Sequence, residues 1–136
     1  MKIHKVCPVI FRENPSKTEI LVFRHPAGDI QLVKGTVEPN EDLQAAALRE
    51  LKEESGIEEV KTLVPKGIWD TGDDNQIWHF YLCEIEEKLA ENWTFFANDD
   101  GGLDFSFFWF DLDENPSHEW HPIFQNALAY IKTHFF

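Results

Sequence analysis

Basic residues, cysteines and long apolar runs are all scarce in this sequence of 136 residues. Lysine and arginine total 12 against 25 aspartates and glutamates, so the formal net charge at pH 7 is −13. A surface of that sign repels nucleic-acid polymers and anionic membranes, and we expect neither as a partner. The N-terminus lacks the apolar run of a signal peptide, and no stretch is long enough to span a bilayer. These absences together predict a cytoplasmic protein.

The two cysteines, Cys7 and Cys83, lie far apart and form no CxxC pair. We expect both to be reduced and buried. The six histidines show no spacing that would supply a third ligand, which argues against a zinc site. Aromatic residues, in contrast, are abundant, with 12 Phe and 5 Trp. This content argues against disorder and, with the length, predicts one folded domain over residues 1–136. The sequence leaves homodimerisation open.

Hydrophobic patterning predicts strands on either side of a central helix. That helix is expected to begin at Asn40, as its N-cap, and to stop at Gly56. A second helix over residues 122–133 closes the chain. Residues 85–104 show no clear periodicity and are predicted to form a long loop. The expected strands span residues 4–12, 17–25, 30–33, 59–69, 76–84 and 105–112. Pro8, inside the first strand, indicates an edge or a bulge. This order is typical of an α/β fold with a mixed sheet between helices.

The first predicted helix carries three glutamates, Glu50, Glu53 and Glu54, on one side. At about 100° per residue they share an arc of about 100° beside the expected core face of Ala47, Leu48 and Leu51. Two unit charges about 5 Å apart repel by roughly 3 kcal/mol at an effective dielectric near 20. By the same angles, Arg49 and Lys52 cover at most one edge of the cluster. A hard divalent cation with oxygen ligands would relieve the repulsion, and the alternative is a solvated acidic face.

The spacing around these glutamates favours the first interpretation. Five residues separate Gly35 from Glu41, and seven more lead to Arg49-Glu50-Leu51, any residue, Glu53-Glu54, any residue, and Gly56-Ile57. This stretch, residues 35–57, resembles the complete Nudix box, the signature of the Nudix hydrolase family. The resemblance implies an α/β/α sandwich. It also implies metal-dependent hydrolysis of a nucleoside diphosphate linked to another group, with Mg²⁺ or Mn²⁺ as cofactor.

The resemblance also implies a role for each residue of the box. Glu50, Glu53 and Glu54 are the expected metal ligands, and Glu50 and Glu53 are the expected catalytic residues, with Glu50 acting as ligand or general base. The remaining positions are expected to support the motif structurally: Gly35, Glu41, Arg49 and Gly56.

Substrate contacts outside the box are predicted from position alone. Lys34 and Arg24 are candidates for contact with phosphate. Asp100 is a candidate substrate contact in the loop after the box, and Asp99, Asp100 and Asp104 are candidates for one more metal ligand. Three aromatic residues offer either base stacking or core packing: Trp69, Trp78 and Phe80.

The approach to the box, residues 30–35, partly resembles that of hydrolases acting on nucleoside polyphosphates. A nucleoside triphosphate or dinucleoside polyphosphate is therefore the first expectation for the substrate. ADP-ribose or a nucleotide sugar is the alternative. A non-catalytic Nudix domain that only senses nucleotides is a further alternative, against which the complete glutamate set argues.

Overall fold

The structure is a computed structural model that describes residues 1–98 and 101–136. Two helices lie in these residues, α1 (Leu43–Ser55) and α2 (Pro122–His134). The strands are β1 (Ile3–Val9), β2 (Phe11–Asn14), β3 (Lys17–Arg24), β4 (Ile30–Gln31), β5 (Gly35–Thr36), β6 (Thr62–Asp70), β7 (Gln76–Glu84), β8 (Trp93–Ala97) and β9 (Leu103–Asp111). Neither of these helices has the length and apolar character that crossing a membrane would require.

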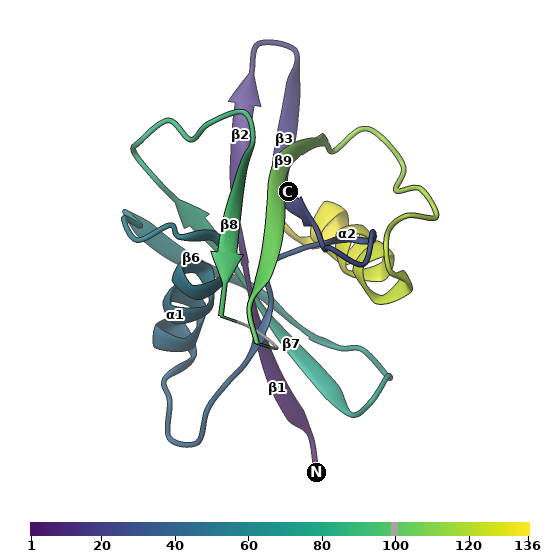
Figure 1. The fold of residues 1–136 in the computed structure, drawn as a ribbon. Coiled ribbons are helices and arrows are strands. Elements are labelled where there is room, and N and C mark those ends of the chain that lie inside the picture. The colour runs from purple at the N-terminus through teal and green to yellow at the C-terminus, as the bar shows by residue number, and fades with distance from the viewer. Residues whose placement is uncertain (99–100) are drawn as a thin grey trace.

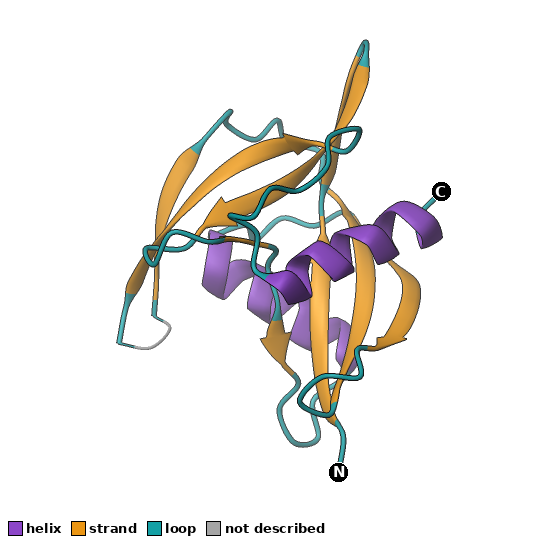
Figure 2. Cartoon of the chain, turned by 90° about the vertical axis from the view of Figure 1, so that its right-hand side faces the viewer, coloured by secondary structure: helices purple, strands orange, loops and turns teal. Residues whose placement is uncertain are grey.

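The strands form two sheets that run in different directions (Figures 1 and 2). In the first sheet the order is β5-β1-β7-β6, with β1 and β7 parallel and the other pairs antiparallel. In the second sheet the order is β2-β3-β9-β8, all antiparallel, with β4 attached to β3. The chain passes from the first sheet to the second through a single residue, the buried Ile10.

Helices α1 and α2 lie on opposite sides of the strands (Figure 1). The side chains of β1 alternate between these sides. Val6 packs with Ala46 and Ala47 of α1, whereas Cys7 belongs to the cluster that contains Leu128 of α2. The predicted α/β/α arrangement with mixed strand directions is therefore confirmed, although the strands form two sheets where one was expected.

Pro8 lies opposite Tyr81 on the β7 side of β1. On the other side, β5 pairs with β1 only at Lys5 and Val6. Pro8 therefore lies beyond the short β5, in a stretch of β1 with a strand on one side only. A proline is tolerated at such a position because no partner strand needs its missing N–H. The edge that the sequence predicted is thus confirmed locally.

Residues 85–104 contain a strand that the sequence analysis missed. The five residues of β8 pair antiparallel with β9, which itself begins at Leu103 rather than Phe105. Burial along β8 alternates, with Thr94 and Phe96 exposed between more buried neighbours. Phe96 is exposed although it is aromatic. Phe95, Phe96 and Ala97 therefore read as a continuous apolar run, which hides the period-two pattern in the sequence.

The start of α1 also differs from the prediction. Asp42, and not Asn40, is the N-cap, and its side chain accepts a hydrogen bond from the Ala45 backbone N–H at 3.3 Å. Asn40 instead has a positive φ of 63°, a left-handed conformation that asparagine tolerates in turns. At the other end, Gly56 has φ 82°, and its N–H donates to the Lys52 carbonyl, so the predicted stop is confirmed.

Both cysteines are free and buried, as the sequence predicted. Burial raises the pKa of the Cys83 thiol to about 12 and raises the pKa of Cys7 still further. A thiol that stays protonated at neutral pH is a weak nucleophile and a weak metal ligand. Both cysteines therefore act as small apolar core residues.

Candidate active site

Arg49 is the centre of the polar network on α1. Its guanidinium donates to both carboxylate oxygens of Glu41, at 2.7 and 2.9 Å. One terminal nitrogen also donates to Glu50 at 2.7 Å and to Glu53 at 3.2 Å, and the other donates to the Thr36 carbonyl at 3.1 Å. Arg49 therefore relieves more of the glutamate repulsion than the helical angles predicted. A long guanidinium side chain can fold along the helix and reach groups on either side of its own position.

The Arg49 network holds the loop before α1 against the helix. Glu41 accepts from the Glu38 backbone N–H as well as from Arg49. Both interactions favour the ionised carboxylate, with Arg49 the larger cause, and they lower the pKa of Glu41 to about 2. The pKa of Arg49 is raised in turn, first by its hydrogen bonds to Glu41. The ion pair therefore stays charged across the pH range in which enzymes normally work.

Two of the three glutamates point into the protein and not along the border of the core face. Glu54 is 7% exposed, and the side chain of Glu50 is 12% exposed. Leu48, expected in the core, is instead 41% exposed, and Ala46 is fully buried. The buried face is thus rotated relative to the one that the apolar residues predicted. It includes carboxylates because Arg49 and backbone N–H groups satisfy them.

The backbone before α1 touches two of the glutamates. The Lys34 backbone N–H donates to Glu54 at 3.1 Å. Gly35 packs directly against Glu50, because a Cβ added at Gly35 would lie 1.8 Å from the Glu50 carboxyl carbon. Any side chain at position 35 would therefore displace this carboxylate. Glycine is required here by the close approach of a functional group and not by a positive φ.

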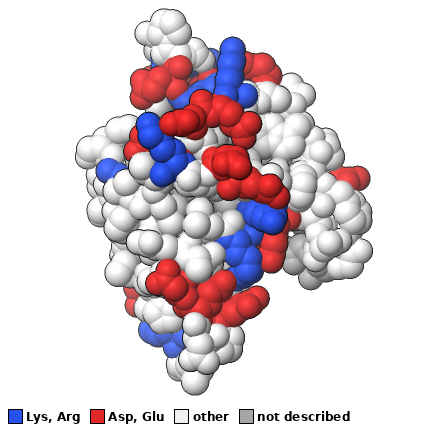
Figure 3. Space-filling model, turned by 90° about the vertical axis from the view of Figure 1, so that its left-hand side faces the viewer, with Lys and Arg blue, Asp and Glu red and all other residues white. Residues whose placement is uncertain are grey.

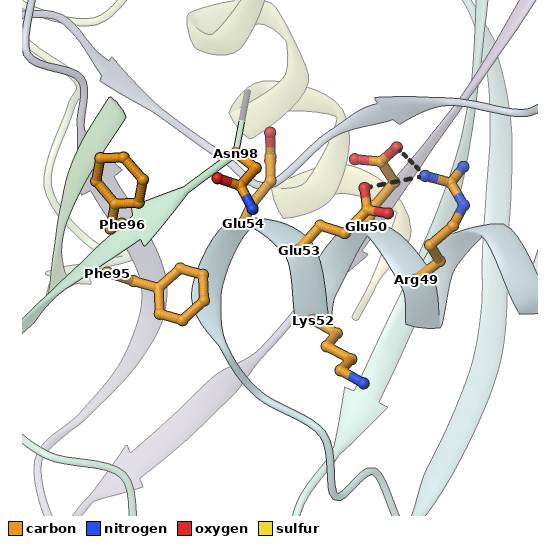
Figure 4. A pocket seen from close by; sticks show the side chains of 8 residues that line it. All are labelled: Arg49, Glu50, Lys52, Glu53, Glu54, Phe95, Phe96 and Asn98. Atoms are coloured by element: carbon orange, nitrogen blue, oxygen red, sulfur yellow. Dashed lines mark hydrogen bonds and ion pairs between the residues drawn. The ribbon is translucent and has the colours of Figure 1, made fainter. Parts of the chain in front are cut away.

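The glutamates lie between two pockets. Both pockets are lined by Arg49, Glu50, Glu53 and Glu54. The aromatic pocket, about 550 Å³, adds Lys52, Phe95, Phe96 and Asn98 (Figure 4). The lysine pocket, about 460 Å³, adds Lys5, Lys34, Gly35, Thr36 and Glu38. Figure 3 looks onto the side of the molecule that carries α1, where acidic and basic side chains lie intermixed. The carboxylates are thus accessible from two directions.

The donor chemistry of these residues fits a hard divalent cation, since three carboxylates share both pockets. In the described parts of the chain, however, no three His, Cys, Asp or Glu side chains converge as a metal site requires. Glu53 is the side chain best able to complete the set. It is 56% exposed, and its single 3.2 Å contact with Arg49 is of a kind that contributes under about 1 kcal/mol.

The candidate substrate residues fall in different places. Lys34 lines the lysine pocket, with its ammonium 5.3 Å from the Trp78 ring centre. Arg24 lines neither pocket and donates to the Gly28 carbonyl and to Glu119. Asp104 lies on β9, opposite Phe96, and also lines neither pocket. Asp99 and Asp100 lie outside the described residues. Of the three aromatic candidates, Trp78 and Phe80 are core residues and Trp69 is partly buried against them.

Sequence reasoning missed three residues of the aromatic pocket: Phe95, Phe96 and Asn98. All three lie on β8 or directly after it, within residues 85–104, which the sequence predicts as a loop. The sequence signal that could have located the strand is its run of β-forming residues, Trp93-Thr94-Phe95-Phe96.

Comparison with known proteins identifies the family. The model of the NUDIX domain family matches residues 3–130, which is nearly the whole chain. This protein belongs to the Nudix hydrolase family. Its Nudix box is therefore the segment that carries Arg49 and the three glutamates.

Solved structures agree with that family in fold. A MutT NUDIX hydrolase from Burkholderia pseudomallei is 20% identical with TM-score 0.69, over 95% of this chain and 97% of that one. An ADP-ribose pyrophosphatase from Streptococcus suis is 20% identical with TM-score 0.63, over 98% and 92%. A MutT/Nudix family protein from Listeria innocua is 17% identical with TM-score 0.63, over 96% and 91%. No curated protein matches significantly.

Proposed function

We propose that this Nudix hydrolase cleaves a phosphoanhydride bond in a nucleoside diphosphate derivative, with Mg²⁺ or Mn²⁺ bound by Glu50, Glu53 and Glu54. The observation that carries the proposal is the shared position of these carboxylates in two open pockets, with two of them fixed by Arg49, Gly35 and the Lys34 backbone. A bound divalent cation would supply charge neutralisation and polarise a phosphoryl oxygen. We also propose that residues 1–136 act as a single domain.

The proposed roles of the three glutamates differ because their side chains are held to different degrees. Glu50 and Glu54 are fixed by short contacts, and they offer oxygens at constant positions. Glu53 is the exposed member and adjusts to the ligand. We propose Glu50 as ligand or general base, because it borders both pockets and contacts Arg49 and Gly35. Lys5 provides positive charge for the phosphates on the other side of the glutamates. Lys34 as a phosphate contact stays a prediction.

The first candidate substrate is a nucleoside triphosphate or dinucleoside polyphosphate, on the evidence of the approach to the box. ADP-ribose or a nucleotide sugar is the second candidate. The likeness to the Streptococcus suis ADP-ribose pyrophosphatase, at 20% identity, concerns the fold alone. Arg24 as a phosphate contact and Asp100 as a substrate contact stay predictions. Homodimerisation also stays a prediction.

Chromatographic separation of the nucleotide products, after incubation with nucleoside triphosphates, dinucleoside polyphosphates, ADP-ribose or nucleotide sugars and with Mg²⁺ or Mn²⁺, tests the proposal. We expect turnover of at least one substrate and none in the presence of a chelator. The Glu53→Gln, Glu54→Gln double variant, purified in the same way, controls for contaminating phosphatases. Nucleotide binding without turnover of any substrate would contradict hydrolysis and identify a sensor domain.

A second measurement assigns the role of Glu50. Mn²⁺ affinity of the Glu50→Gln variant, measured by calorimetry beside its kcat, distinguishes base from ligand. Lost turnover with wild-type Mn²⁺ affinity identifies Glu50 as the base, whereas loss of both identifies a ligand. Wild-type turnover in this variant would remove Glu50 from the catalytic assignment.

A further inference from the structure

The aromatic pocket contains a large apolar side chain, Phe96, that binding a metal or a phosphate would not require. Phe96 is 60% exposed at the mouth of a pocket that is otherwise lined by charged and amide side chains and by Phe95 (Figure 4). The other exposed large apolar residues of the described chain, such as Leu48, Ile68 and Phe136, do not line this pocket. A ring in contact with water beside catalytic carboxylates offers a flat apolar surface to a ligand.

The surroundings of Phe96 hold its ring in one place. A Cβ at Gly102 would lie 2.3 Å from the tip of the Phe96 ring, so the ring rests against this glycine. Phe96 also belongs to β8, which is paired with β9 on one side through a regular antiparallel register. A stacking surface on a strand is more precisely placed than one on a loop. The ring is therefore preorganised without being buried.

The two pockets differ in chemistry in the way that the two halves of a nucleotide differ. The lysine pocket carries Lys5, whose ammonium suits phosphate oxygens. The aromatic pocket carries Phe95 and Phe96, which suit a planar ring, and Asn98, whose amide can donate and accept at the edge of a base. The glutamates that both pockets share lie where the bond between the two halves would be cleaved.

We infer that Phe96 is a specificity-determining residue of this hydrolase, on whose ring the substrate's nucleobase stacks while the phosphates extend across the glutamates toward Lys5. The inference rests on the proposed function and names the part of the substrate that the enzyme recognises. Asn98 contacts the edge of the stacked base. The enzyme therefore favours substrates that carry a base over phosphoanhydrides that lack one.

Steady-state kinetics of the Phe96→Ala variant test this inference with ATP, GTP, ADP-ribose and, as a base-free comparator, ribose 5-triphosphate. We expect KM for the best base-bearing substrate to rise about tenfold, because stacking a base on an aromatic side chain contributes on that scale. We expect kcat to stay within about twofold of wild type, and KM for ribose 5-triphosphate to stay unchanged. Phe96→Trp keeps a stacking face and should keep KM within about twofold.

Two further variants separate stacking from general damage. Phe136→Ala removes a similarly exposed phenyl ring at the C-terminus and should leave every KM unchanged. Lys5→Ala should raise KM for the base-bearing and base-free substrates equally. Equal KM ratios in Phe96→Ala and wild type, or a rise shared by ribose 5-triphosphate, would overturn the inference.

Binding measurements keep the inference testable if hydrolysis is absent. Calorimetric titration with α,β-methylene ATP compares wild type and Phe96→Ala without any turnover. Weaker binding by Phe96→Ala, with inorganic triphosphate binding unchanged, supports base stacking even if the proposed hydrolysis fails. Equal affinities of the two proteins, or no binding to either, would overturn it.

Discussion

Helices α1 and α2 have the same length, 13 residues, and cover opposite sides of the strands, but they bury different kinds of residue. The buried positions of α2 are all apolar: Phe124, Ala127, Leu128 and Ile131. Those of α1 include Glu54 and Ser55 beside two alanines and one leucine. Helix α2 is thus held by apolar contact, whereas α1 also depends on Arg49 and on backbone hydrogen bonds. Helix α1 therefore gives up some apolar packing and instead holds carboxylates in fixed positions.

The comparison predicts that substitutions in α1 lower turnover, whereas substitutions in α2 lower stability. The largest expected change is a loss of turnover in α1. Glu54→Gln removes a charge but keeps an oxygen that can accept from the Lys34 backbone N–H. We expect kcat to fall at least about 100-fold, the scale of losing a group that acts in the transition state. The midpoint of urea unfolding should move little. Wild-type kcat in this variant, with metal present, would contradict the site assignment.

A matched change in α2 should reverse that pattern. Leu128 is fully buried in the α2 core cluster. Leu128→Ala should lower the free energy of unfolding by about 2–5 kcal/mol, because it removes apolar contact and leaves a cavity. Urea denaturation measures the loss, and kcat per folded molecule, measured at low temperature, should stay near wild type. A large fall in kcat with no loss of stability would remove the contrast between the helices.

The contact between Gly35 and Glu50 provides a finer probe of the α1 side. Gly35→Ala forces the Glu50 carboxylate to move, and a misplacement of this size typically lowers turnover about 10- to 100-fold. Steady-state kcat and circular dichroism should show lost turnover in a folded protein. Gly72→Asn is the control, since Gly72 has φ 69° and no atom near its Cβ position. Equal activity in both variants would show that this contact is dispensable.

The smallest predicted effect concerns His79, which lies in a pocket beside the start of α1 and contacts His4 at 2.8 Å. Burial, and then the charge of His4, lower the pKa of His79. The unfolded chain therefore binds a proton more readily than the fold, so stability should fall as pH drops below about 6.5, by at most about 1.4 kcal/mol per pH unit.

Thermal unfolding between pH 8 and pH 5 measures this dependence. His79→Gln should flatten the wild-type slope below pH 6.5, and His118→Gln, at an exposed position, should leave it unchanged. Identical slopes in wild type and His79→Gln would show that the burial of this imidazole does not affect folding.

The sequence predicted what depends on local pattern and missed what depends on the partners of a residue. Gly56 as the helix stop and the glutamate spacing follow from positions along the chain. The reach of Arg49 to Glu41, Glu50 and Glu53 does not, because helical angles place Cβ atoms and not the end of a long side chain. The division into two sheets and the pairing of β8 with β9 also depend on contacts between distant residues. The catalytic and metal roles of the glutamates stay predictions until they are measured.

Ile10 joins the two sheets by one residue, and its carbonyl already accepts from the Leu21 N–H of β3 at 2.9 Å. Because this connection is one residue long, we expect that one sheet cannot unfold here while the other stays intact. Slow hydrogen exchange should therefore report a single opening event for amides of β3 and β7 alike, with one common free energy. Ile10 would then link the strands of both sheets into one cooperative unit.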